Sequence, residues 1–505
     1  MTLTPEAFAQ DAAPLIRQTN DQSALFSPIC RHGCAFDPAI FKKVMLNLIQ
    51  NPNLLSNWLF RADLIAEHEG CDDEVVLEGV PESEGLRPVI PQIDGFQRGR
   101  VIVRRLIPRN AKRDRPLLQT CIFYNDTSVL ADAAPQKTLV VYLPHIATVE
   151  EIPFYHPKVR GLGYLHEWNP AESKGTVSIH YRFLSDEDRI ARPVKLERTA
   201  LMMISVIHKH GEGKRTGYVK RVHHDQLVPQ ATVQDCYHDL KDRYARDLLG
   251  SWRENTDPGK HVFEDLSIAA FLIELWREMY KDQPFPGFVD IGCGNGLLTY
   301  LLNKEGYKGW GFDARARKSW DIYNDVVVDA DGKKSSTLQE RVLLPSIVAM
   351  PATEESDKEC VDNERFQDGR FPKGTFIVSN HADELTPWTP ILGAISDCPW
   401  ISIPCCSHNL TGAKFRAAPP KDKSKGGSAY ASLTEWVADI AADCGWVVER
   451  EMLRIPSTRN AALVGRKRTQ PVESVDIDEI ILKYGGTQGY FENAMKLVKT
   501  GPRSH

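Results

Sequence analysis

Residues 287–313 constrain the fold of this chain more than any other stretch of its sequence. The segment GFVDIGCGNGLLTYLLNKEGYKGWGFD reads as an apolar strand, a glycine-rich turn, a helix, a short loop and a second strand that ends in an acid. Glycine tolerates positive φ and has no Cβ, so a turn with Gly292, Gly294 and Gly296 lets the backbone pass close to a ligand. This order of elements is typical of one half of a nucleotide-binding sheet.

Two acidic residues flank this turn and narrow the choice of ligand. Asp290 ends the first strand directly before the glycines, and Asp313 ends the second strand. A carboxylate at Asp290 repels a pyrophosphate and attracts a cation, whereas Asp313 is placed to accept hydrogen bonds from ribose hydroxyls. S-adenosylmethionine has a ribose and a positively charged amino group but no phosphate. The Gly-x-Gly-x-Gly spacing also differs from that of dinucleotide folds, so the sequence favours a methyl-donor site over a nicotinamide enzyme or a purely structural turn.

We therefore expect a site for S-adenosyl-L-methionine at the carboxyl end of the first strand. Strand-like and helix-like segments alternate from 260 to 467, which predicts a doubly wound α/β domain with a mainly parallel sheet. This Rossmann-like sheet with a methyl-donor turn is the fold of class I S-adenosylmethionine-dependent methyltransferases. The residues predicted to contact the cofactor are Asp290, Gly292, Gly294, Asn295, Gly296, Asp313 and Asn380.

Composition and spacing divide the chain into three predicted parts. An N-terminal α+β region covers residues 1–250, the methyltransferase domain covers 251–470, and a tail covers 471–505. Within the first part, helical spacing of apolar residues occurs at 41–49 and 54–66. Strand-like runs bounded by Pro, Gly and Asp occur at 101–103, 120–124, 138–142 and 176–183.

The composition also sets limits on compartment and metal content. No apolar run approaches the roughly 18 residues of a membrane span, and the N-terminus lacks the pattern of a secretory signal. The 11 cysteines are an odd number and are scattered, which favours a reducing compartment over a disulfide framework. Cys30, His32 and Cys34 resemble part of a metal site, but no second pair of ligands follows at a suitable spacing. We expect no metal.

Charge is segregated along the N-terminal half, although the net charge of the whole chain is only −5. Residues 67–84 contain eight acids and no Lys or Arg, and eight basic residues then follow within 98–115. Such a run is either a solvated face or a surface that contacts phosphates. The basic residues of this run are Arg98, Arg100, Arg104, Arg105, Arg109, Lys112, Arg113 and Arg115.

Groups suited to acid–base chemistry follow a later strand of the predicted sheet. Residues 380–388 read Asn-His-Ala-Asp-Glu-Leu-Thr-Pro-Trp, and the carboxyl ends of parallel strands meet at one edge of the sheet. A hydroxyl that accepts a methyl group needs help from a base more than an amine does. His381, Asp383 and Glu384 are the candidate catalytic residues. The alternative is that the two acids only stabilise the N-terminus of the next helix.

Two further clusters follow the last strands. Cys405 and Cys406 are interpreted mainly as tight packing near the cofactor, with a covalent or metal-binding role left open. Arg454 and Arg459 belong to a loop rich in hydroxyl side chains, which suits either phosphate contacts or a structural ion pair.

Several motifs together resemble one family, the fungal tRNA uridine-44 2′-O-methyltransferases. The most specific are His-Ala-Asp-Glu-Leu-Thr-Pro-Trp at 381–388, Pro-Cys-Cys at 404–406 and Arg-Ile-Pro-Ser-Thr-Arg-Asn at 454–460. Ala382 stands where the family motif often has Ser. The other matching segments are 220–225, 261–265, 268–272, 288–298, 306–313 and 318–321.

The resemblance implies a cytoplasmic enzyme that methylates the ribose of a serine tRNA. A net acidic chain must concentrate its phosphate contacts, so the resemblance also favours an RNA-binding role for some basic side chains. These are Arg98, Arg100, Arg104, Arg105, Arg109, Lys112, Arg113, Arg454 and Arg459, with a second basic group at Lys214, Arg215, Lys220 and Arg221. A base or protein methyltransferase of the same fold, and a catalytically idle RNA-binding scaffold, remain as alternatives.

Overall fold

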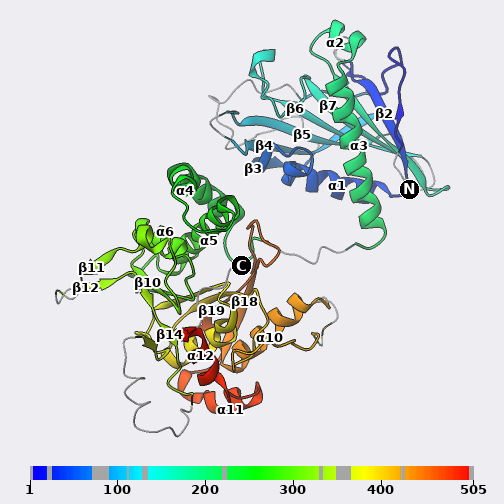
Figure 1. Ribbon diagram of the computed structural model, residues 1–505. Helices are drawn as coiled ribbons and strands as arrows, with labels where there is room; N and C mark the ends of the chain where they lie inside the picture. Colours follow the sequence, from blue (N-terminus) through cyan, green and yellow to red (C-terminus); the bar gives the residue numbers. More distant parts are fainter. Residues whose placement is uncertain are drawn as a thin grey trace, which may run out of the picture. The chain divides into compact units, whose positions relative to one another are not determined.

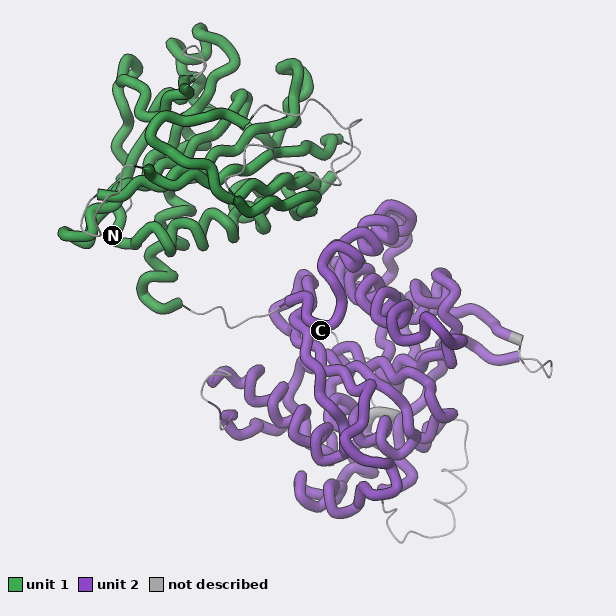
Figure 2. The backbone as a smooth tube through the Cα atoms, turned by 180° about the vertical axis from the view of Figure 1, so that it is seen from behind, with its two compact units in different colours: residues 1–219 green, residues 220–505 purple. Residues whose placement is uncertain are grey.

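The protein consists of two compact units, residues 1–219 and 220–505 (Figure 2). The computed structural model describes residues 4–19, 25–70, 90–110, 113–127, 135–218, 224–328, 332, 334–348, 365–420, 422 and 427–499. The boundary lies at 219 rather than at 250 as predicted, because α4 (Gln230–Gly250) packs on α5 (Pro258–Met279) in the second unit. Leu240 and Leu248 of α4 are buried in the core that contains α5.

Unit 1 is built on an eight-stranded sheet with the order β1-β2-β8-β7-β6-β5-β4-β3. All neighbouring strands are antiparallel. The four strands expected from the sequence all lie in this sheet, in β4, β5, β6 and β8. The strands are β1 (Glu6–Ala7), β2 (Ser27–Cys34), β3 (Leu59–His68), β4 (Phe96–Pro108), β5 (Leu117–Asp126), β6 (Gln136–Pro144), β7 (Gly161–Asn169) and β8 (Lys174–Arg182).

Two helices of unit 1, α1 (Pro38–Gln50) and α3 (Val194–Arg215), share one core with the sheet, and Figure 1 shows α3 lying along it. The start of α1 is fixed by the Asp37 side chain, which accepts a hydrogen bond from the Ile40 amide at 2.8 Å. A short helix, α2 (Asp186–Ala191), precedes α3.

The helix expected at 54–66 is wrong. This stretch forms the end of a single 3₁₀ turn, η1 (Pro52–Leu54), and most of strand β3. Strand β3 pairs with β4 over nearly its whole length, so pairing within the sheet overrides the helical spacing of its apolar residues. The acidic run begins at the end of β3, and its remainder from residue 71 onward lies outside the described residues.

Unit 2 has the predicted doubly wound α/β fold. Its seven-stranded sheet has the order β13-β10-β9-β16-β17-β19-β18. The first five strands are parallel, and β19 and β18 complete the sheet as an antiparallel pair. The strands are β9 (Phe288–Ile291), β10 (Gly309–Asp313), β13 (Leu338–Glu340), β16 (Phe376–Asn380), β17 (Trp400–Ile403), β18 (Trp446–Met452) and β19 (Ala461–Arg468).

Helices cover both faces of this sheet. Alternating residues of the strands contribute to two separate cores, with Phe288 in one and Val289 in the other. The first core contains α4, α5 and α6 (Leu297–Lys304), and the second contains α9 (Thr389–Ser396) and α10 (Ala429–Asp443). No helix among the described residues is both long and apolar enough to cross a lipid bilayer.

The C-terminal segment, predicted as a tail from residue 471 onward, packs as part of unit 2. It contains α11 (Ile477–Lys483) and α12 (Tyr490–Lys499). Ile480, Ile481 and Tyr490 are buried in the second core, and the Tyr490 hydroxyl donates to the Leu343 carbonyl at 2.9 Å. This packing places α12 beside the pocket described next, since Tyr490 also lines it.

Candidate active site

A cleft of about 920 Å³ lies in unit 2, where the carboxyl ends of the parallel strands meet. It is lined by residues that follow β9, β10, β16 and β17 and by side chains of α5. The strand ends that the sequence singled out therefore converge on one pocket, as the doubly wound topology requires.

The glycine turn forms one wall of this cleft. Gly292 has φ +70°, and a Cβ at this position would lie 3.0 Å from the Cβ of Ala382. Gly294 has φ +53°, but a Cβ there would meet no atom within 4 Å, so the turn is open to a ligand at this point. Gly296 is not part of the lining, and the cofactor contact predicted for it is not supported. It forms the left-handed N-cap of α6, where a Cβ would lie 2.4 Å from the Leu338 side chain.

Two buried carboxyl groups line the cleft beside the glycine turn. Asp290 is 1% exposed and accepts a hydrogen bond from the Thr299 hydroxyl at 2.9 Å through Oδ2, whereas its Oδ1 has no partner. Asp265 of α5 is also buried, and neither acid forms an ion pair among the described residues. Burial, with the nearby charges of Glu264 and Asp290, raises the pKa of Asp265 well above its usual range. A cation bound beside these groups would favour their ionised forms and lower both pKa values.

Asp313 is held in place by the backbone of the neighbouring loops. Its Oδ2 accepts the Gly294 amide at 3.1 Å, and its Oδ1 accepts the Arg315 amide at 3.2 Å. Burial raises the pKa of Asp313, although Arg317 and these hydrogen bonds act in the opposite direction. Each oxygen retains lone-pair capacity for a ligand hydroxyl.

Two asparagines predicted to contact the cofactor also line the cleft. The Asn295 side chain accepts the Leu297 amide at 2.9 Å. Asn380 donates to Asp265 Oδ1 at 3.5 Å, while its own Oδ1 is buried without a partner. Asn380 Oδ1 and Asp290 Oδ1 are thus two acceptors without a partner, on the neighbouring strands β16 and β9. Unsatisfied acceptors of this kind are expected where a bound ligand supplies the hydrogen-bond donors.

His381 is the candidate base with the most defined surroundings. It follows β16 with φ +53°, and its amide donates to the Ile403 carbonyl at 3.1 Å. Its Nε2 lies 3.1 Å from Oε1 of Glu264, and its Nδ1 is buried without a partner. Burial alone would raise the pKa of Glu264, but the hydrogen bond and charge of His381 outweigh it and lower that pKa.

The sequence did not single out Glu264 or Asp265 as site residues. Both lie on α5 between its apolar positions, where helical spacing predicts only a polar face. The available signal was the adjacent pair of acids, because two neighbouring carboxyl groups on a mostly buried helix need a partner.

Asp383 and Glu384 line the same cleft in the first turn of η3 (Asp383–Trp388). Both acids lie in the first turn, where they can stabilise the helix N-terminus, although no side chain caps it through a hydrogen bond, so the alternative role stays open. Asp383 has φ +42° and accepts a hydrogen bond from the Cys405 thiol at 3.2 Å. Asp383 is therefore hydrogen-bonded to a thiol, and His381 is hydrogen-bonded to a carboxylate.

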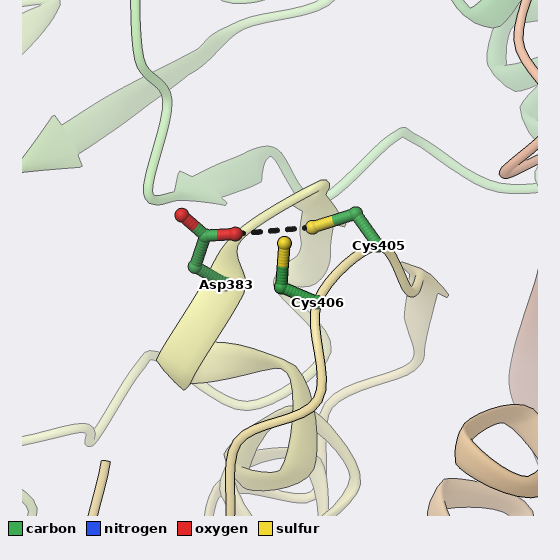
Figure 3. Close-up of side chains that lie close together, drawn as sticks. All are labelled: Asp383, Cys405 and Cys406. Atoms are coloured by element: carbon green, nitrogen blue, oxygen red, sulfur yellow. Dashed lines mark hydrogen bonds between the residues drawn. The ribbon is translucent and has the colours of Figure 1, made fainter. Parts of the chain in front are cut away.

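Asp383, Cys405 and Cys406 lie close together (Figure 3), and the first two line the cleft. One ligand atom from each residue falls within 4.8 Å of the others, and no other described group of three such residues is close enough to hold an ion. A closed structural zinc site requires four protein ligands. The three residues therefore do not form such a site by themselves.

We expect the thiols of Cys405 and Cys406 to be dispensable for chemistry. Burial and the charge of Asp383 raise the pKa of both thiols, whereas a nucleophilic cysteine needs a thiolate. Cys405→Ser and Cys406→Ser should each retain methyl transfer within about threefold, since packing changes little. Steady-state kinetics with and without a zinc chelator checks this, and a loss of more than about 100-fold in either variant or with chelator would contradict it.

Basic side chains surround the cleft, and most of them were missed from the sequence. The run Arg315-Ala-Arg317-Lys318 directly after Asp313 was the available signal. The basic lining residues are Lys260, Arg315, Arg317, Lys318, Arg341, Arg459 and Lys496. Of the two arginines predicted in the last loop, Arg459 lines the cleft and Arg454 does not. Arg454 forms a two-point ion pair with Asp225 at 3.0 and 2.6 Å, which matches the structural alternative.

The arginine run of unit 1 is not one continuous surface. Arg109 and Arg113 are exposed, and Arg98, Arg100 and Arg105 are half-buried, with Arg100 paired to Glu67. Arg104 is only 3% exposed, so its prediction as a surface RNA contact is wrong. Gln119 and two carbonyls of α1 bind its guanidinium inside the unit. Lys112, Lys220 and Arg221 lie outside the described residues.

The fold and the acid-lined cleft of unit 2 define a class I S-adenosylmethionine-dependent methyltransferase. Family models agree with this class: residues 227–343 match "Predicted AdoMet-dependent methyltransferase", and residues 6–221 match "TRM44-like, N-terminal bet v1-like domain".

Relatives extend the match over nearly the whole chain. A protein of Neurospora crassa named tRNA (uracil-O(2)-)-methyltransferase is 55% identical over 98% of both chains. Proteins of the same name from Schizosaccharomyces pombe and Debaryomyces hansenii are 39% and 35% identical, over 94% and 98% of this chain and 93% and 98% of their own. The chain belongs to the tRNA (uracil-O(2)-)-methyltransferase family.

Proposed function

We propose that this protein transfers a methyl group from S-adenosylmethionine to the ribose 2′-oxygen of uridine 44 in serine tRNAs, in the cytoplasm. The family membership and the methyltransferase fold support the reaction class. The observation that carries the choice of a hydroxyl acceptor is the hydrogen-bonded pair of His381 and Glu264 beside the acid-lined turn. A pair of this kind can take up a hydroxyl proton at the point where the acceptor binds.

The residues of the cleft suit this donor. Asp290 and Asp265 can ionise when its cationic groups bind beside them, and the open turn at Gly294 leaves room for a ligand against the backbone. Asp313 is oriented to accept hydrogen bonds from two ribose hydroxyls. When bound, S-adenosylmethionine supplies an activated methyl group on a sulfonium.

The pair of His381 and Glu264 supplies the proton acceptor. Glu264 accepts the hydrogen on Nε2 of His381, which leaves the lone pair of the ring on Nδ1. Nδ1 is the buried nitrogen without a partner, and a substrate hydroxyl is the donor that it lacks. Glu264 then stabilises the imidazolium that forms, as the carboxylate does in a catalytic triad.

The alternatives fit the site less well. Amine methylating enzymes often carry Asn-Pro-Pro-Tyr or Asp-Pro-Pro-Tyr at the end of this strand, where the chain has Asn380-His381-Ala382-Asp383. An idle RNA-binding scaffold needs no buried acids around the turn, yet Asp265 and Asp290 are both kept in the pocket at an electrostatic cost.

The proposed substrate is tested with purified protein, labelled methyl donor and two serine tRNA transcripts. One transcript is complete and the other has U44 replaced by cytidine. The proposal expects label in the complete transcript and at least a tenfold lower rate with the other. Equal labelling of both transcripts would reject uridine 44 as the target.

Donor binding should weaken at acidic pH through Asp290. Burial raises the pKa of Asp290 to about 7. The hydrogen bond from Thr299 lowers this pKa, and the charge of Asp313 raises it further. A bound cation favours the ionised carboxylate, so binding below this pKa must release a proton. Affinity should therefore fall by up to about tenfold per unit as pH drops below 7 and level off above it. Calorimetric titration from pH 6 to 8 checks this, and a flat profile like that expected for Asp290→Asn would contradict it.

A further inference from the structure

Unit 1 contains a cavity of about 340 Å³ that is separate from the methyl-donor cleft. It lies between α3, the segment 52–59 and the strands β4 to β7, with the loop 154–157 at one side. Its volume is at the lower end of the range for small-ligand pockets, enough for one planar group and its substituent. The reaction proposed for unit 2 does not involve this cavity.

The inner wall of the cavity has a buried positive charge. Arg104 donates to Gln119 Oε1 at 3.0 and 2.6 Å and to the carbonyls of Leu48 and Ile49 at 3.1 and 2.6 Å. No carboxylate among the described residues pairs with its guanidinium, so the charge is held by neutral acceptors alone. A buried cation without a counter-ion is costly, and it disfavours a purely apolar occupant of the cavity.

The same wall has an unused polar group. The Tyr142 ring lies 4.8 Å from the Arg104 guanidinium carbon, and its side chain is only 1% exposed. Its hydroxyl has no hydrogen-bond partner. The neighbouring polar groups are already satisfied, since Gln119 also contacts His156 Nε2 at 2.9 Å. A buried hydroxyl left alone in this way is available to a ligand.

Aromatic and basic side chains meet at the mouth. Trp58 and Phe154 both line the cavity and are 46% and 55% exposed, with ring centroids 5.3 Å apart in an edge-to-face arrangement. Lys195 Nζ lies 4.0 Å from the Phe154 centroid, and the Arg113 guanidinium carbon lies 5.8 Å from that of Trp58. Exposed aromatic faces beside cations are how proteins stack unpaired bases and hold their phosphates.

We propose that this cavity binds one unpaired nucleotide of the RNA substrate. The base stacks on one ring of the Trp58–Phe154 pair and meets the other at its edge. Lys195 and Arg113 contact the phosphates beside it, and Tyr142 bonds the part that enters the cavity. The inference rests on the proposed function for the identity of the RNA as tRNA. It gives unit 1 a defined point of contact with substrate in place of the continuous arginine surface that the sequence predicted.

The test measures binding of a labelled serine tRNA transcript to the full chain by fluorescence anisotropy at one fixed salt concentration. The double variant Trp58→Ala/Phe154→Ala should bind about tenfold or more weakly, because each stacked base contributes strongly. Tyr142→Phe, which removes only the free hydroxyl, should bind about threefold more weakly. Leu15→Ala, at a residue 47% exposed in unit 1 and outside the cavity, is the matched control. Donor affinity and melting temperature should stay at the wild-type values.

The outcomes separate this inference from the proposed function. If the double variant binds tRNA as tightly as the wild type, or if Leu15→Ala loses as much affinity, the nucleotide site is overturned even when methylation is normal. If the double variant loses affinity while the wild type methylates no tRNA, the nucleotide site stands and the proposed reaction fails. An excess of unpaired oligouridine should compete for the wild type, and competition by an RNA duplex alone would overturn the site.

Discussion

Replacing His381 by Gln should lower kcat for methyl transfer by about 10²- to 10⁴-fold, the usual contribution of a general base. Gln keeps a polar side chain of similar length but cannot take up a proton. Affinities for the donor and for tRNA should change little, since the donor is held by the glycine turn and its acids. Steady-state kinetics and separate binding titrations measure the three quantities.

Two comparisons decide whether His381 acts as a base or only supports the loop. Glu264→Gln keeps a hydrogen-bonding group on Nε2 but removes the charge, so kcat should fall at least about tenfold. His238→Gln changes a histidine on α4 that pairs weakly with Asp242 at 3.7 Å, and it should leave kcat unchanged. If kcat of the His381→Gln variant is close to the wild-type value and keeps the same dependence on pH, catalysis rests on positioning alone.

Replacing Asp290 by Asn should weaken donor binding by about 100-fold or more. The change removes one charge from a buried site that has no basic partner of its own, and truncation of a buried charge pair typically costs 2–5 kcal/mol. Asn keeps the shape and can still accept the hydrogen bond from Thr299. Affinity for tRNA should be nearly intact.

Calorimetry with S-adenosylmethionine provides the measurement. Asp282→Asn is the matched control, because this acid is exposed, carries the same charge and lies outside the cleft. Donor affinity within about threefold of the wild type for Asp290→Asn would show that the charge of Asp290 does not bind the donor.

Local spacing predicted the fold of unit 2 and several of the residues that line its cleft. Asp290, Asp313 and His381 end or follow strands, and the topology of a parallel sheet brings such positions together whatever the loops contain. Glu264 and Asp265 were not predicted, because they come from a helix whose position over the strand ends depends on tertiary packing. Nothing in helical spacing separates a buried acid from a solvated one.

The burial of Arg104 in unit 1 also could not be predicted from local spacing. A run of arginines favours an exposed surface, but the acceptors that bury this one come from α1 and β5, which are distant in sequence. The C-terminal segment is a similar case. Its two helices are short, and their burial depends on a core formed by the rest of unit 2.

The central claim is that the methyl group goes to the ribose oxygen of a uridine, and hydrolysis of labelled tRNA tests it most directly. Methylation removes the 2′-hydroxyl that alkali needs to cleave the next phosphodiester. After reaction with radiolabelled donor, we expect label in one alkali-resistant dinucleotide and, after complete enzymatic digestion, in 2′-O-methyluridine. Label released by alkali as a mononucleotide methylated on its base would contradict it.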